Sequence, residues 1–119
     1  MANKQRGEVE VRLAGKTWTM RPTFQALCEI EGRTGVGITT LARRCHEGDF
    51  GAGPIVAVLW AGIRATHDDA PDHDEVGRLV VAEGVIGFAA PALEFLLAAL
   101  LGDGAGKKVE KKKAAAKNP

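Results

Sequence analysis

The hydrophobic pattern near the amino terminus first alternates at every second residue and then changes to a helical period. Within residues 9–13, apolar and charged side chains alternate, as they do in a strand that buries one face. Residues 16–20 repeat this alternation, and a two-residue turn at 14–15 would join the two strands into a hairpin with all its large apolar side chains on one face. The expected pairs are Leu13 with Lys16, Val11 with Trp18 and Val9 with Met20.

The following residues predict two helices that are each ended by a glycine. Pro22 and Thr23 are typical of a helix start, and Gly32 is placed to end the first helix. Residues 38–47 have apolar side chains at helical spacing, and Gly48 follows them. The side chains expected to form the apolar stripes are Phe24, Leu27, Cys28 and Ile30 in the first helix, and Ile38, Leu41, Ala42 and Cys45 in the second.

A third and a fourth helix come next. Pro54 can occupy the first turn of a helix that runs to about Thr66, and the sequence IVAVLWAGI within it is apolar on all sides, which predicts the central buried element. Either Asp72 or Asp74 can cap the fourth helix, and Gly84 is expected to end it. The apolar stripe of the fourth helix is Val76, Leu79 and Val80.

The segment 85–101 is strongly apolar and has two interpretations. It is too short for the roughly twenty apolar residues of a membrane span and contains Glu94, so we expect no membrane insertion. It is either an unusually buried core helix or a surface for association with another protein. We expect Leu93, Leu96, Leu97 and Leu100 to face the core, and Phe95 and Leu101 to be exposed. The candidate partner-binding residues are Phe95, Leu101 and Leu97.

These elements predict an α+β fold in which a two-stranded antiparallel hairpin packs on four to five short helices. We expect a flexible amino terminus over residues 1–7, one globular domain over 8–102 and a disordered tail over 103–119. Residues 1–102 contain 10 Lys and Arg against 13 Asp and Glu, a net charge of −3, whereas the tail contains 6 Lys against 2 acids, a net charge of +4. Such a tail can attract nucleic acid without reading its sequence, but its most ordinary role is to increase solubility.

The cysteines and the amino terminus predict the cellular compartment. Cys28 and Cys45 both fall in predicted helices, and we expect both thiols to be reduced and buried. The first residues, MANKQRGEVE, lack the apolar run of a signal peptide. We therefore expect a cytoplasmic protein.

Three groups of residues resemble a phosphate-binding loop, a metal site and a reactive Cys–His pair, but none has the full pattern of such a site. Residues 32–39 match the phosphate-binding spacing G-x-x-x-x-G-K-[ST], except that Ile38 replaces the lysine and a helix rather than a strand precedes the loop. Residues 67–75 contain two histidines and five carboxylates, but their spacing fits no ordered metal site, so a solvated loop with a helix cap is the better interpretation. Cys45 and His46 are adjacent on one helix and cannot face each other. The chain has no serine, and we expect no catalysis, cofactor or metal.

A family resemblance is carried by the order of four short blocks: GEVEVRLAGKTWTMRPTF, ALCEIEGRTG, LARRCHEG and VAVLWAGIRA. In this order they resemble the small tail proteins of gene transfer agents and related long-tailed phages, over about residues 7–102. This family is described as tail assembly chaperones and in some descriptions as tail tube components. The resemblance implies a protein of the host bacterial cell that binds the tape measure protein and the tail tube protein during particle assembly. It implies no catalytic residue.

Three functions follow from this resemblance and from the composition. In the first, the protein is a chaperone that holds the long apolar stripes of the tape measure protein in solution, either alone or as a homo-oligomer. In the second, it is a structural part of the tail, although a tube subunit would need long strands that pair between neighbours, which one short hairpin cannot supply. In the third and most distant, the lysine-rich tail binds nucleic acid, without sequence specificity.

Overall fold

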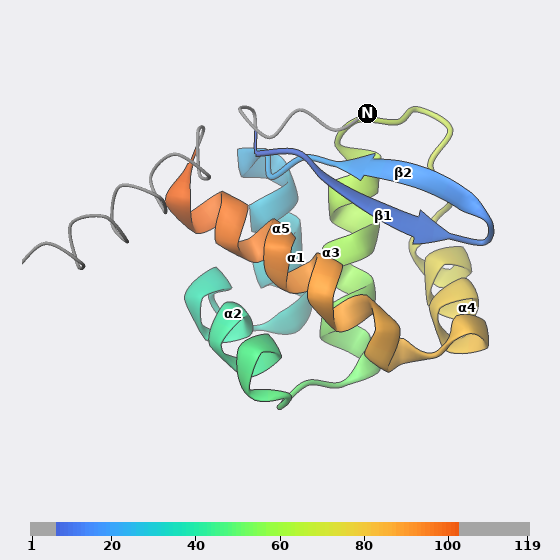
Figure 1. Cartoon of the computed structure of the whole chain (residues 1–119). Coiled ribbons are helices and arrows are strands. Elements are labelled where there is room, and N and C mark those ends of the chain that lie inside the picture. The colour runs from blue at the N-terminus through green and yellow to red at the C-terminus, as the bar shows by residue number, and fades with distance from the viewer. Residues whose placement is uncertain (1–6, 103–119) are drawn as a thin grey trace, which may run out of the picture.

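The computed structural model of the protein describes residues 7–102, in which a β-hairpin lies across a set of five α-helices (Figure 1). This arrangement confirms the predicted α+β class. The predicted lysine-rich tail, residues 103–119, lies outside the described residues, as do residues 1–6. The elements are β1 (Val9–Leu13), β2 (Lys16–Met20), α1 (Phe24–Thr34), α2 (Ile38–Glu47), α3 (Ala52–Arg64), α4 (His73–Glu83), the 3-10 turn η2 (Val85–Phe88) and α5 (Ala89–Leu101).

The hairpin has the register that the alternation predicted. Its five pairs run from Val9 with Met20 to Leu13 with Lys16. Ala14 and Gly15 both have positive φ, 54° and 75°, which is the geometry of a two-residue turn that follows the twist of the strands. The turn is fastened to α4, because the amide of Ala14 donates a hydrogen bond to Oε2 of Glu83 at 2.7 Å. The hairpin side chains that are buried against the helices are Val11, Leu13, Trp18 and Met20.

Hydrogen bonds from the region after α3 also hold the outer edge of β2. The amide of Thr19 donates to Nε2 of His67 at 3.2 Å, and the hydroxyl of Thr66 donates to the carbonyl of Thr19 at 2.6 Å. One residue beyond the strand, the amide of Arg21 donates to the carbonyl of Gly62 at 3.2 Å. The outer edge of β2 at Thr19 is therefore already paired within the chain.

Helix α1 begins as predicted and ends later than predicted. Thr23 caps it, since its hydroxyl accepts a hydrogen bond from the amide of Ala26 at 3.1 Å. The prediction that Gly32 ends the helix is wrong: Gly32 is helical, and the left-handed residue is Gly35, with φ of 75°. Gly35 therefore has the left-handed conformation that a glycine tolerates better than other residues.

The apolar stripe of α1 is also rotated relative to the prediction. Its buried residues are Ala26 and Ile30, which lie one turn apart. Phe24 and Cys28 are each two positions away from this stripe, about 200° around the helix, and both are exposed. The prediction that Cys28 is buried is therefore wrong, whereas Cys45 on α2 is buried as expected.

Helix α3 is the central element that its uniformly apolar sequence predicted. Every residue from 55 to 63 is buried, and the helix packs against α1, α4, α5 and β2. Gly62 lies at the tightest contact, because a Cβ atom placed there would come within 2.8 Å of the Phe95 ring and 2.9 Å of Cβ of Met20. This glycine lets β2 and α5 approach α3 together.

The second half of the molecule bends sharply between its last two α-helices. Asp72 caps α4 by accepting a hydrogen bond from the amide of Glu75 at 2.9 Å, and Gly84, with φ of 99°, ends it. The segment 85–101 forms η2 and then α5, and Pro91 lies in the first turn of α5. Within residues 7–102 no single helix is long and apolar enough to span a membrane; α4 and 85–101 reach that length and hydropathy only as a pair bent by 114°.

The predicted orientation of α5 is wrong at three residues. Phe95, expected to be exposed, has no exposed surface, and Leu97, expected to face the core, is 43% exposed. Leu100, also expected in the core, is 44% exposed, whereas Leu96 is buried as predicted. The physical reason is the space beside Gly62, which accepts the Phe95 ring and so fixes the rotation of the helix.

Candidate functional site

The outward face of α5 is the first candidate surface. Leu97 and Leu100 lie three positions apart and therefore on the same side of the helix, and both are nearly half exposed. Leu93 and Leu101 flank them and are partly buried. Of the three predicted partner-binding residues, Leu97 and Leu101 lie on or beside this surface, whereas Phe95 is enclosed in the core and cannot contact a partner without unfolding.

Other exposed apolar side chains are scattered over separate elements. Phe24 on α1 is 83% exposed, Ile86 on η2 is 82% exposed and Val81 on α4 is 64% exposed. Val81 borders an apolar groove of about 660 Å³ between α4 and the first turns of α3, whose lining includes Gly53 and Gly77. Single exposed apolar residues are ordinary on protein surfaces, so these positions identify no site by themselves.

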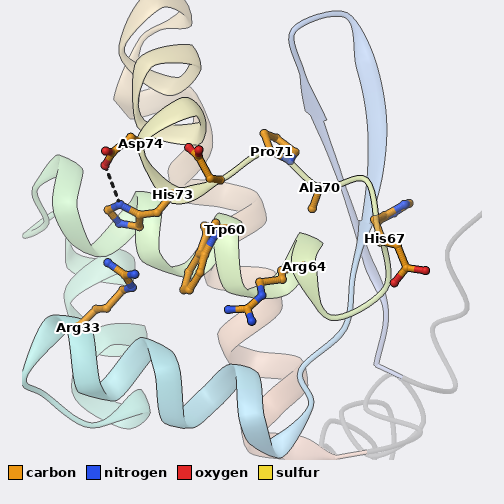
Figure 2. Close-up of a pocket in the computed structure, with 10 residues that line it drawn as sticks. Arg33, Trp60, Arg64, His67, Ala70, Pro71, His73 and Asp74 are labelled. Carbon is orange, nitrogen blue, oxygen red and sulfur yellow. Dashed lines mark ion pairs between the residues drawn. The ribbon is translucent and has the colours of Figure 1, made fainter.

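A second candidate is a polar pocket of about 560 Å³ between the end of α1, the middle of α3 and the segment 65–74 (Figure 2). Its apolar lining residues are Trp60, Ala70 and Pro71, and the remaining lining residues are arginine, histidine and aspartate. Three separate parts of the chain therefore place charged groups around one tryptophan.

Two arginines and one histidine pack around the ring of Trp60. The guanidinium carbon of Arg33 is 4.4 Å from the ring centroid and that of Arg64 is 5.1 Å from it, distances at which a cation is attracted to an aromatic face. The ring of His73 meets Trp60 edge-on, with centroids 5.6 Å apart and an interplanar angle of 82°. Arg64 is also paired with both carboxylate oxygens of Glu29, at 3.0 and 3.1 Å.

The same pocket shows what sequence reasoning missed. Trp60 could only be predicted as buried, because it lies within an apolar run. Arg33 and Arg64 are 31 positions apart, and no local pattern predicts that both approach one ring. The available signal was a tryptophan followed four positions later by arginine on the same helix, which is compatible with a cation–aromatic pair but does not identify a pocket.

Residues 32–39, whose spacing resembles a phosphate-binding loop without its lysine, form the end of α1, a connection and the start of α2. Gly35 ends α1 and Gly37 begins α2. The carboxylate of Glu31 accepts a hydrogen bond from the amide of Ile38 at 3.0 Å, so a negative charge already occupies the amino-terminal end of α2. A phosphate at this helix end would meet that carboxylate, and the repulsion disfavours binding.

Side chains of the acidic segment 67–75 form hydrogen bonds and ion pairs that hold neighbouring elements. His67 accepts the Thr19 amide, Asp72 caps α4, and Nδ1 of His73 is 3.5 Å from Asp74. Among residues 7–102 no group of three or more His, Cys, Asp or Glu side chains is arranged to hold a metal ion. The predicted helix cap in this segment is confirmed at Asp72.

The two cysteines have different surroundings. Burial raises the pKa of the Cys45 thiol above its ordinary value, because the charged thiolate loses contact with water. His46 next to it is exposed. Cys28 is exposed on α1. Cys45 is thus held as a neutral thiol, which disfavours its use as a nucleophile.

A family model described as "Phage tail tube protein, GTA-gp10" matches residues 6–102, which include every described helix and strand. No curated protein and no solved structure matches the chain at a significant level.

Proposed function

Since the chain belongs to the phage tail tube protein family GTA-gp10 and its role is tail-associated, we propose that it acts there as a tail assembly chaperone. In this proposal the protein binds the tape measure protein while the tail is being built and helps recruit tail tube subunits around it. It acts in the cytoplasm of the host bacterial cell and performs no catalysis.

The observation that carries the proposal is the exposed pair Leu97 and Leu100 on α5. An unassembled tape measure protein is expected to be a long helix with apolar stripes. Apolar residues at i and i+3 on one helix can pack into the stripe of another, so α5 can cover part of such a helix and keep it from aggregating. Leu101, half-buried beside this pair, extends the surface toward the end of α5.

The hairpin supports a chaperone more than a tube subunit. A tube wall built by strand pairing needs long strands with open edges, and each strand here has five residues. At Thr19 the outer edge of β2 is already paired with His67 and Thr66. A neighbouring subunit could add a strand there only by breaking these bonds.

The second candidate function is a structural component of the tail, either a tube subunit or a protein associated with the tube. The description of the matching family favours it, because that description names a tail tube protein. In this case the protein would remain in the finished particle in many copies.

One experiment separates the two functions. Quantitative mass spectrometry would compare purified particles with the lysate of cells that are assembling them. A chaperone is expected in the lysate and at well below one copy per tube ring in the particles. Stoichiometric amounts in purified tails would reject the chaperone and establish the structural role.

A further inference from the structure

We propose that the outward face of α1 pairs with the same face of a second copy of this chain, with the two helices antiparallel and Cys28 at the two-fold axis. The buried residues of α1 are Ala26 and Ile30, and Cys28 is two positions, about 200°, from each of them. Cys28 therefore points directly away from the core, and it is exposed. A helix that approaches α1 from this side meets Cys28 first, and the two domains then lie on opposite sides of the helix pair.

Phe24 is the large apolar side chain on this face. It lies one turn before Cys28, on the same side of α1, and is 83% exposed. An aromatic side chain removes about 150 to 250 Å² of surface from water when it is covered, so a covered Phe24 is favoured over an exposed one.

The other end of the face has an opening where a side chain would be. Gly32 lies one turn after Cys28, and Gly35 caps the helix. Among the described residues, a Cβ atom at either glycine would meet no atom within 4 Å beyond its own stretch of chain. Cys28, Glu31, Gly32 and Gly35 have the spacing i, i+3, i+4 and i+7, and four such positions form the hole that receives a side chain of a facing helix. Because two of the four are glycines and one is a cysteine, this hole has room for an aromatic ring.

The spacing along α1 makes the face complementary to itself. Phe24 lies four residues before Cys28, and the hole around Gly32 is centred about four residues after it. When two antiparallel copies of α1 meet at Cys28, the Phe24 ring of each copy enters the hole of the other. This is the reciprocal contact that a two-fold dimer requires. A parallel pair would place ring beside ring and leave both holes empty.

The charges on the face are compatible with this orientation. Arg21 lies before Phe24 and is paired with Glu8, while the Glu31 carboxylate lies after Cys28 and accepts the amide of Ile38. The antiparallel arrangement brings the end with Arg21 to the half with Glu31, and it opposes the two helix dipoles. It also separates the two Glu31 residues by about 9 Å along the helix axes, so like charges do not meet.

The small size of the contact predicts a weak dimer. Two covered phenylalanine side chains account for roughly 300 to 500 Å² of buried surface, well below the roughly 1,200 Å² of a stable interface. We therefore expect dimers at protein concentrations of about 100 µM and above, and monomers at about 1 µM. This face is separate from the exposed leucines of α5, and the inference holds for a chaperone and for a structural tail protein alike.

Sedimentation velocity of the full chain under reducing conditions measures the association. Phe24→Gln removes the ring and Gly32→Gln fills the hole, and each should weaken dimerisation by about tenfold or more. Ile86→Gln is the matched control, because Ile86 is 82% exposed but lies on η2. It should change the dissociation constant by less than about twofold.

Cysteine cross-linking locates the two-fold axis. Diamide, which takes up the two electrons and two protons released by a pair of thiols, should join two copies through Cys28, because residues that face each other across the axis are within disulfide reach. The matched control is Cys28→Ala combined with Gln25→Cys, which moves the thiol three positions along the same exposed face. Its two thiols would be about 9 Å apart along the helix axes, so it should cross-link about tenfold more slowly.

Three results would overturn the inference. The first is a protein that stays monomeric at about 0.5 mM, well above the expected range; if Phe24→Gln but not Ile86→Gln then weakened binding of the tape measure protein, the α1 face would belong to the client instead. The second is an equal effect of Phe24→Gln and Ile86→Gln on dimerisation. The third is equally fast cross-linking through positions 25 and 28. Melting curves check that the variants are folded, and if a glutamine variant is less stable, the cross-linking comparison decides.

Discussion

Gly62 is the residue at which α3, α5 and β2 come closest together, and its missing side chain determines how α5 is oriented. The Phe95 ring and the Met20 side chain occupy the space beside it. A methyl group at this position would force one of them to move, although both belong to the fully buried core. The side of α5 on which its leucines lie therefore depends on position 62 of α3 being a glycine.

Gly62→Ala is expected to reduce the free energy of unfolding by about 1 to 3 kcal/mol, because overpacking outweighs the better helix propensity of alanine. Gly32→Ala is the matched control, since Gly32 is helical and exposed, and within residues 7–102 no atom outside its own stretch of helix lies within 4 Å of its Cβ position. It should instead stabilise the protein by about 0.4 to 1 kcal/mol. Urea denaturation measures both changes, and a Gly62→Ala variant as stable as Gly32→Ala would contradict this packing.

The difference in burial between the two cysteines leads to a second prediction at the residue scale. In the native protein at about pH 8, iodoacetamide should modify the exposed Cys28 much faster than the buried Cys45, whose raised pKa leaves little thiolate. The neutral Cys45 thiol contributes stability that is present below the ordinary thiol pKa and is lost as the pH rises through its raised value. Mass spectrometry of the modified peptides checks the order, and faster labelling of Cys45 would show that it is not buried.

At the scale of elements, the hairpin is held by the segment after α3 as well as by the pairs between its own strands. His67 accepts the amide of Thr19, and the ring of His67 also meets Trp18 edge-on with centroids 5.0 Å apart. Removing this imidazole leaves a partly buried amide without its acceptor.

His67→Ala is therefore expected to lower the free energy of unfolding by about 1 to 3 kcal/mol. His46→Ala should change it by less than about 0.5 kcal/mol, because His46 is exposed and makes no contact of this kind with the part of the chain that the structure describes. Chemical denaturation followed by tryptophan fluorescence compares the two variants. Equal stability of both would mean that the hairpin does not depend on His67.

The hairpin register and most helix ends could be predicted, because each depends on residues close together in the sequence. Alternation and the 14–15 turn determine the hairpin register, Thr23 and Asp72 begin helices, and Gly48 ends α2. The end of α1 was misplaced because either Gly32 or Gly35 could take the left-handed conformation, and the sequence does not say which one does.

The orientation of α5 and the Trp60 pocket could not be predicted, because both depend on contacts between distant segments. Phe95 faces inward because of Gly62, which the sequence shows only as one residue of an apolar run. Arg33 and Trp60 meet because α1 packs on α3, and nothing near either residue indicates the other.

The corrected orientation of α5 changes which substitutions the fold should tolerate. Phe95→Glu places an unpaired carboxylate in the core and should prevent folding, whereas Leu97→Glu should leave a folded protein with a stability change of about 1 kcal/mol or less. Circular dichroism melting curves distinguish the two. A folded Phe95→Glu protein, or an unfolded Leu97→Glu protein, would contradict the described face of α5.

At the scale of the whole molecule, the apolar surface is unevenly distributed. The neighbouring pair Leu97 and Leu100 lies on one helix face, while Val81 and Ile86 lie on separate elements and are more exposed. This difference allows a matched comparison of charge substitutions. If the chaperone proposal is right, a charge on the exposed α5 leucines should weaken binding of the tape measure protein more than a charge on the more exposed Val81 and Ile86 does.

The most direct measurement is the amount of soluble tape measure protein when it is co-expressed with variants of this chain. The wild-type protein and the double variant Val81→Glu, Ile86→Glu should both keep the tape measure protein soluble. The double variant Leu97→Glu, Leu100→Glu should fold, as judged by its melting curve, yet leave the tape measure protein in the aggregated fraction. A folded α5 variant that keeps it as soluble as the wild-type protein does would contradict the assignment of client binding to this surface.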